Sequence, residues 1–227
     1  FKRVWEVYIM AFPSVYEMFV EDLTTVRKQH FWEYFSGSKL PMSSSVYSQT
    51  TVNDHVQIAQ SPSTEDSRAG AKITSASNGM VGNTINALTV QLANPYSTTA
   101  GYNVFAVVWD SSGNVRSTSD TISINSITNY PTWTDYTFSF SSPVTVNNGD
   151  VVGVTSDGGT INSSSLIVKV NTSNVDSTST FYTYRNGAWF TTHFGGTADM
   201  YLIAITGSTA RWTTSDITHT GTYAMVD

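Results

Sequence analysis

Cysteine is missing from this 227-residue chain, and charged side chains make up only 12% of it. Without cysteine, neither disulfide bonds nor thiolate metal sites can form. The 17 acidic residues outnumber the 11 basic ones, and the resulting formal charge of −6 argues against a surface that binds the phosphate backbone of nucleic acids. No run of about 18 apolar residues is present, so the sequence predicts no membrane-spanning helix.

Glutamate and catalytic motifs are also scarce. The chain has five glutamates and none after Glu65, whereas glycoside hydrolysis typically needs two carboxylates that flank the scissile bond. The aspartates after Glu65 mostly stand in turn sequences. The sequence Gly-x-Ser-x-Gly is absent, and the four histidines (His30, His55, His193 and His219) show neither His-x-His nor His-x-x-x-His spacing. These absences predict a protein that is not an enzyme.

Hydroxyl and aromatic side chains, in contrast, are abundant. Serine and threonine together number 64, aromatic residues make up 13% of the chain, and hydrophobic residues make up 40%. This apolar share is large enough to build a folded core. Many hydroxyls with few charges are typical of β-rich proteins that work outside a cell or on a particle surface. We therefore expect an extracellular, cell-surface or virion location.

Residues 1–40 are expected to form a helical segment that precedes the main domain. Met10 reads as a natural start, which makes residues 1–9 an upstream extension. Ser14 and Glu17 have the spacing of a capping box, and apolar residues follow at helical intervals. We therefore predict an α-helix over about 14–35, whose apolar tail must pack on the following domain or on another chain. The side chains expected at that interface are Phe19, Phe31, Trp32 and Phe35.

After Pro41 the hydrophobic pattern changes to alternation, which predicts β-strands. Residues 166–170 show it most clearly, and it recurs at 136–140 and 200–205. Residues 102–109 are apolar on both faces, as in a central strand. Turn sequences rich in glycine and asparagine separate these runs. We therefore predict an all-β domain over 41–209, a jelly-roll β-sandwich of about 8–10 antiparallel strands.

Two aromatic segments are candidates for sugar binding, which needs exposed rings together with a few polar partners. One segment places two rings beside Pro131, and the other, residues 181–190, contains several rings and an arginine. The alternative for these rings is packing in the core or at a sheet edge. The candidate glycan contacts are Tyr130, Trp133, Tyr184, Arg185 and Trp189.

Two turn sequences contain oxygen ligands suited to a structural calcium ion. The candidate ligands are Asp110 and Asn114 in one turn and Asp157 in the other. Neither turn contains a second acidic residue, which favours the alternative that each aspartate caps its own turn. No other cofactor is expected.

Residues 66–206 resemble jelly-roll β-sandwich modules of carbohydrate-binding-module type, which occur in secreted, cell-surface and phage-related proteins. The segments that carry this similarity are 68–73 (RAGAKI), 133–138 (WTDYTF), 143–153 (PVTVNNGDVVG), 187–189 (GAW) and 199–202 (DMYL). These are folding motifs, so the resemblance implies a fold rather than a ligand.

The two ends of the chain resemble a different family, the concanavalin-like lectin/glucanase-type domains. Residues 35–41 (FSGSKLP) resemble the opening of such a domain, and 211–217 (RWTTSDI) with 221–225 (GTYAM) resemble the segment that usually follows it directly. This split implies that the jelly roll is inserted in a host domain to which the strand segment 210–227 belongs. Either the chain is then a fragment, or its terminal strands pair with other subunits.

Three functions follow as hypotheses. The first is a non-catalytic surface or structural β-sandwich protein for adhesion, decoration or receptor binding on a virion, filament or cell envelope. It would assemble with itself or with other structural subunits through the N-terminal helix and the terminal strands. The second is a carbohydrate-binding module of a larger secreted glycan-active protein, with a glycan as partner. The third, a fragment of a concanavalin-like glycoside hydrolase, is disfavoured by the missing glutamate pair.

Overall fold

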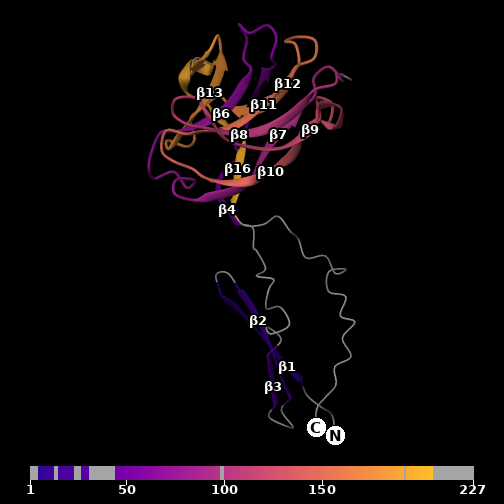
Figure 1. Cartoon of the computed structure of the whole chain (residues 1–227), viewed down its shortest axis with the longest axis vertical. Coiled ribbons are helices and arrows are strands. Elements are labelled where there is room, and N and C mark those ends of the chain that lie inside the picture. Colours follow the sequence, from indigo (N-terminus) through magenta and orange to yellow (C-terminus); the bar gives the residue numbers. More distant parts are fainter. Residues whose placement is uncertain are drawn as a thin grey trace. The chain divides into compact units, whose positions relative to one another are not determined.

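The computed structural model describes residues 5–12, 15–22, 27–30, 44–97, 100–191 and 193–206. The chain divides into two compact units, Ser43–Gly207 and the combination of Phe1–Met42 with Ser208–Asp227 (Figure 1). The described parts are all-β apart from two short 3-10 helices, η2 (Ile124–Ser126) and η3 (His193–Gly196). Among the described residues, no helix has the length and apolar character needed to cross a membrane.

The described part of the smaller unit is a three-stranded antiparallel sheet in the order β1-β2-β3. Its strands are β1 (Trp5–Phe12), β2 (Val15–Asp22) and β3 (Arg27–His30). The β1–β2 register runs from Trp5↔Asp22 to Phe12↔Val15, and β3 continues the sheet from Phe19↔His30.

This sheet corrects the prediction of a helix over about 14–35, because residues 15–22 and 27–30 are strands. The physical reason lies in residues 5–12, which are rich in aromatic and branched side chains and pair along their whole length with residues 15–22. That pairing outweighs the local capping signal at Ser14. Of the side chains expected at an interface, Phe19 belongs to β2, while Phe31, Trp32 and Phe35 lie outside the described residues.

The larger unit contains thirteen strands, more than the 8–10 predicted. The additional ones are short, such as the three-residue β14 and the two-residue β15, and too brief to show an alternating pattern. The strands are β4 (Ser44–Gln49), β5 (Asp54–Ile58), β6 (Arg68–Ile73), β7 (Thr84–Ala93), β8 (Asn103–Trp109), β9 (Val115–Ser123), β10 (Thr134–Thr145), β11 (Val151–Ser156), β12 (Leu166–Asn171), β13 (Ser179–Arg185), β14 (Ala188–Phe190), β15 (Asp199–Met200) and β16 (Leu202–Thr206).

These strands form two halves that share one core. The first half has the order β14-β13-β6-β11-β8-β9, and every pair in it is antiparallel. In the second half β7 pairs with β10, β12 and β16, and these lead to the outer strands β5, β15 and β4. A single pair, Phe140↔Ser119, joins the halves through β9 and β10. This mostly antiparallel arrangement is consistent with a β-sandwich.

Alternating side chains from both halves fill the core, as the sequence pattern predicts. Leu166, Val168 and Val170 of β12 are fully buried, whereas Lys169 between them is only partly buried. Each fully buried aliphatic side chain of this kind stabilises the fold by about 1.5–3 kcal/mol. The predicted central strand, β8, lies between β11 and β9. Because alternate residues point to opposite faces, the residues between the core positions form the outer surface of each half.

The two ends of the larger unit lie side by side. Strands β4 and β16 pair antiparallel from Gln49↔Leu202 to Ser44↔Thr206, and the hydroxyl oxygens of Ser44 and Thr206 are 2.9 Å apart. Figure 1 shows the two strands together at one end of this unit. The chain therefore enters and leaves the unit at adjacent positions.

Candidate functional site

The segment that carries Tyr130 and Trp133 is fixed by hydrogen bonds before any ligand arrives. It runs between β9 and β10, and its Asn129 pairs with Asn94 just after β7. The Tyr130 amide donates to the Asn94 carbonyl at 3.0 Å, and the Tyr136 hydroxyl accepts from the Thr128 amide at 2.7 Å. A segment held in this way loses little conformational freedom when it binds a partner.

Four side chains meet at this segment and are called the Tyr130 cluster here: Tyr130, Trp133, His55 and Lys169. The Tyr130 and Trp133 ring centroids are 6.0 Å apart at an interplanar angle of 86°. The His55 ring lies 5.9 Å from Tyr130 and 5.8 Å from Trp133. The Lys169 ammonium lies 4.4 Å from the Trp133 ring centroid, within the range of a cation–π contact. His55 and Lys169 are directly paired across β5 and β12, so the sheet itself places them under the rings.

Polar groups and a cleft border the Tyr130 cluster. The Gln57 side-chain oxygen accepts hydrogen bonds from the Ser165 hydroxyl at 2.9 Å and from the Tyr96 hydroxyl at 3.4 Å. This fixes the Gln57 amide, and its NH₂ group has donors to offer a ligand. The adjoining cleft has a volume of about 350 Å³, and its lining residues are His55, Val56, Gln57, Glu65, Asp66, Ile161, Asn162 and Phe194. Because His55 and Gln57 line the cleft, the rings and the cleft form one continuous surface.

A second group of rings lies on the outer surface of the first half and is called the Arg68 cluster here: Arg68, Trp109, Tyr184 and Trp189. The Trp189 ring packs edge-on against Trp109 at 5.2 Å and against Tyr184 at 5.3 Å. The Arg68 guanidinium lies 4.0 Å from the Tyr184 centroid, and the other two rings are within 6.0 Å. Partial burial lowers the pKa of Arg68 below its ordinary value, although a guanidinium stays protonated.

Most of the Arg68 cluster is packed rather than open. Trp109 is 1% exposed and forms a small outer core with Val107 and Val151. The indole nitrogen of Trp189 is buried and has no hydrogen-bond partner among the described residues. Leaving this N–H group unpaired costs free energy, so the ring serves mainly to cover apolar surface. In contrast, Tyr130 of the first cluster is 49% exposed.

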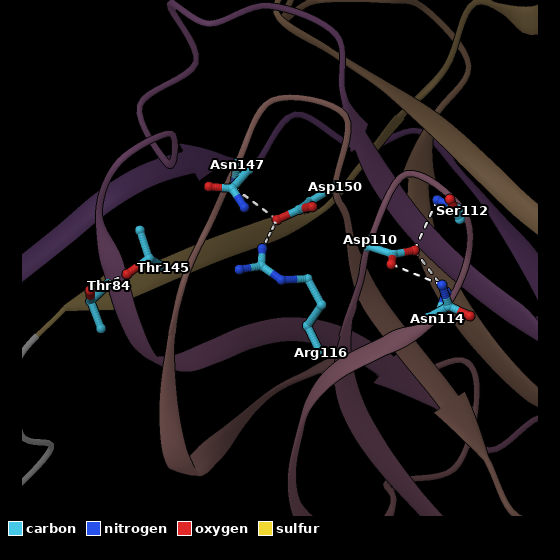
Figure 2. A network of polar contacts seen from close by, with 8 residues as sticks. All are labelled: Thr84, Asp110, Ser112, Asn114, Arg116, Thr145, Asn147 and Asp150. Atoms are coloured by element: carbon cyan, nitrogen blue, oxygen red, sulfur yellow. Dashed lines mark hydrogen bonds and ion pairs between the residues drawn. The ribbon is translucent and has the colours of Figure 1, made fainter.

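Of the candidate calcium ligands, Asp110 and Asn114 meet in one turn, but Asp157 lies apart from them. Asp110 Oδ1 accepts from the Ser112 and Asn114 amides, both at 2.9 Å, and Oδ2 accepts from the Asn114 side-chain amide at 2.9 Å (Figure 2). These hydrogen bonds lower the pKa of Asp110, and the one from the Asn114 side chain has the largest effect. Asp157 instead accepts from both nitrogens of Asn103, at the opposite end of β8 and about 20 Å away at ordinary strand spacing. The described residues contain no group of three or more metal-binding side chains.

Beside that turn, an ion pair ties β9 to the turn before β11. Arg116 donates to Asp150, whose carboxylate also accepts from the Asn147 amide at 2.8 Å. Figure 2 shows Asp150 between these two donors. The Asp150 side chain is 4% exposed, so this carboxylate is occupied in holding the fold and is not open to a ligand.

Two further carboxylates belong to Asp199 on β15 and to Asp176, whose backbone amide donates to Asp199. Asp199 is 1% exposed, and its Oδ2 accepts from the amides of Val175 and Asp176, while Oδ1 has no partner among the described residues. Burial raises the pKa of Asp199, and the two amides offset only part of that effect. Burial also acts to raise the pKa of Asp176, but hydrogen bonds from Thr178, Tyr47 and Ser179 leave it below its ordinary value.

The structure divides the five predicted glycan contacts between two places. Tyr130 and Trp133 meet in one cluster and Tyr184 and Trp189 in the other, while the Arg185 guanidinium lies 5.0 Å from the Phe190 ring instead. Sequence reasoning missed His55, Lys169, Arg68 and Trp109. Each of these reaches its cluster through strand pairing between residues far apart in the chain, such as His55↔Lys169, and no local motif signals such a pairing.

Comparison of the chain with protein-family models, with curated proteins and with solved structures finds no match.

Proposed function

We propose that this chain is a non-catalytic saccharide-binding protein with a jelly-roll β-sandwich, and that the Tyr130 cluster contacts the sugar. The observation that supports it best is the exposed Tyr130 ring on a fixed segment. Tyr130 is 49% exposed and stands with Trp133 and His55 beside a polar cleft. Sugar rings offer apolar C–H faces that pack on aromatic rings, together with hydroxyls that need hydrogen-bond partners.

The chemistry of the surrounding groups supports this proposal. Tyr96 is 38% exposed, and its hydroxyl donates to Gln57, which lines the cleft. It therefore adds a further accessible ring with a hydroxyl. The cleft lining combines the amide side chains of Gln57 and Asn162 with the carboxylates of Glu65 and Asp66, while Lys169 is engaged with the Trp133 ring. A few fixed polar groups beside apolar rings are the common composition of a small-molecule site, and they suit a ligand that is rich in hydroxyls.

The place of action in this proposal is the outside of a cell or particle. The protein would serve adhesion, decoration or receptor binding on a virion, filament or cell envelope, and it would assemble with itself or with other structural subunits through its terminal strands. The low charge and the 64 hydroxyl residues favour such a location. The adjacent ends of the larger unit suit its insertion in a host domain of concanavalin-like type. As a carbohydrate-binding module of a larger secreted glycan-active protein, the same site would bind the same class of ligand.

Affinity gel electrophoresis tests the proposal. The full chain is run through gels that contain the neutral polysaccharides laminarin, agarose or mannan, beside Tyr130→Ala, Trp133→Ala and the control Val175→Ala. Val175 is 54% exposed and apolar but stands outside both clusters. We expect at least one polysaccharide to retard the wild type and Val175→Ala, and both ring variants to lose about tenfold or more in affinity. Retardation by none of them, or retardation that survives both ring substitutions, would overturn the proposal.

A further inference from the structure

Two cations and two tyrosines form a regular pattern on the outer surface of the first half. Arg68 and Lys72 lie on β6, and Tyr184 and Tyr182 lie beside them on β13. The Arg68 guanidinium is 4.0 Å from the Tyr184 ring centroid, and the Lys72 ammonium is 4.9 Å from that of Tyr182. We call these four residues the β6–β13 face. All four are only partly buried, so the face has access to solvent.

Neither cation of this face has a carboxylate partner among the described residues. Arg68 contacts only rings, and Lys72 contacts only Tyr182. Arg116, by comparison, is ion-paired with Asp150. Aromatic rings interact with the face of a guanidinium and leave its N–H edge available to a planar anion. The edge of Arg68 is therefore free to form the paired hydrogen bonds that carboxylates and sulfates accept.

The charge of this face is opposite to that of the unit around it. Residues 43–207 contain ten acidic and five basic side chains, yet two of the five basic ones stand on this face. On the other side of β6, the residues paired with Arg68 and Lys72 are the neutral Thr155 and Val151 of β11. The strands thus place two cations on this face, and their direct partners on both neighbouring strands are uncharged.

Between the two cations β6 has a glycine, and neighbouring side chains cover it. Gly70 is buried, a Cβ on it would come within 2.7 Å of Val151 Cγ1, and its partner on β13 is Tyr182. Gly70 lies midway on β6, and it pairs directly with Gly153 of β11. A Cβ atom at Gly153 would come within 2.0 Å of the Ala69 carbonyl oxygen, so close strand contact requires glycine there. Arg68 and Lys72 are four residues apart on one strand, which separates their backbones by about 13 Å. A ligand that reaches both must be extended and carry its negative charges well apart.

We propose that the β6–β13 face binds an acidic saccharide, with Arg68 and Lys72 holding its carboxylate or sulfate groups and Tyr182 and Tyr184 contacting its sugar rings. Charges carried on every second or third ring suit the two separated cations. A densely charged polyanion such as nucleic acid is repelled by the net charge of −6. The choice of a saccharide rests on the proposed function, whereas the anion site stands on its own geometry and is separate from the Tyr130 cluster.

Isothermal titration with matched oligosaccharides tests this inference. The probes are an oligogalacturonate, the same oligosaccharide with its carboxylates reduced to neutral CH₂OH groups, and inorganic sulfate. The proteins are the wild type, Arg68→Gln, Arg68→Lys and Lys72→Gln, with Lys28→Gln as the control that removes a cation from β3 of the smaller unit. Lys72 lies outside the packed rings, so Lys72→Gln keeps the test valid if Arg68→Gln fails to fold.

We expect the wild type to bind the acidic oligosaccharide about tenfold or more tightly than the neutral one, and less tightly as salt is raised. Arg68→Gln and Lys72→Gln should each abolish most of this preference, and Arg68→Lys should restore only part of it, because lysine cannot form the paired hydrogen bonds. Lys28→Gln should keep it. Equal binding of the two oligosaccharides, or a preference unaffected by both glutamine variants, would overturn the inference, and sulfate binding as tight as the oligosaccharide would overturn its saccharide part.

The two proposals fail in different ways. Loss of neutral polysaccharide binding in Tyr130→Ala with unchanged binding of oligogalacturonate leaves both intact. Absence of any neutral binding with an Arg68-dependent acidic preference overturns only the role of the Tyr130 cluster.

Discussion

The Tyr130 cluster and the Arg68 cluster are built from similar parts but differ in what lies beneath them. Each combines at least two aromatic rings with a cation stacked on a ring. In the Arg68 cluster the rings close over Trp109, which is 1% exposed, whereas Tyr130 projects from its segment and is 49% exposed. The difference teaches that an aromatic segment becomes core or exposed surface according to the strand beside it. Strand β8 and its neighbours supply apolar surface that the rings cover. Strands β5 and β12 instead supply the polar side chains of His55 and Lys169.

Truncation of Trp109 should give the largest effect on stability. Trp109→Ala removes a buried ring from contact with Trp189, Val107 and Val151, and we expect the free energy of unfolding to fall by about 3–5 kcal/mol. Urea denaturation followed by circular dichroism measures it. The matched control is Trp133→Ala, for which we expect a loss of about 1 kcal/mol or less. Similar losses in the two variants would remove the distinction between the clusters.

A methyl group at Gly153 should give the next largest effect, because it must displace the Ala69 carbonyl of β6. We expect Gly153→Ala to lower the free energy of unfolding by about 2 kcal/mol or more, as overpacking against backbone does. Gly101→Ala serves as the control, since no atom lies within 4 Å of its added Cβ. If Gly153→Ala unfolds at the same urea concentration as Gly101→Ala, the β6–β11 contact is looser than described.

Asp199, which is buried, and Asp176, which is only partly buried, should give pH effects of opposite sign, away from both clusters. Because the pKa of Asp199 is raised in the fold, its contribution to stability is present below its ordinary pKa and is lost as the pH rises through the raised value. Because the pKa of Asp176 is lowered, its contribution is present above its ordinary pKa and is lost as the pH falls through the lowered value.

We therefore expect Asp199→Asn to stabilise the protein at pH 7 by about 1 kcal/mol, since it removes a buried charge, and Asp176→Asn to destabilise it by a similar amount. Urea denaturation at pH 7 and at pH 4 measures both. A destabilised Asp199→Asn at pH 7 would mean that the charged carboxylate is needed there. Neither substitution should change the binding of a saccharide, because neither aspartate belongs to a cluster.

Loss of the Tyr130 ring should have the smallest effect on stability and a large effect on binding. The ring is half exposed and covers little apolar surface, so we expect Tyr130→Ala to cost about 0.5 kcal/mol or less in the free energy of unfolding. Thermal denaturation of the variant, run on the sample used for affinity electrophoresis, measures it. A loss above about 2 kcal/mol would show that Tyr130 supports the fold as Trp109 does.

Local patterns in the sequence were sufficient to predict the all-β character of the larger unit, because alternation at residues such as Leu166 and Val168 reports burial directly. They failed at residues 14–35, where the strand partner of Val15–Asp22 is the preceding segment Trp5–Phe12. The ring pair of Tyr130 and Trp133 follows from their closeness in the chain. His55 and Lys169, 114 positions apart, became neighbours through the β5–β12 register, which depends on the whole fold.

The pairing of β4 with β16 also determines how the larger unit responds to mechanical load. Tension applied to the chain at Ser44 and Thr206 would act on the end of one strand pair, across the direction of both strands. Hydrogen bonds loaded in this geometry break one after another, like a zipper, whereas bonds loaded along the strands resist together. Stretching the chain through these two points should therefore peel β4 from β16 at low force, beginning at the Ser44–Thr206 hydroxyl contact.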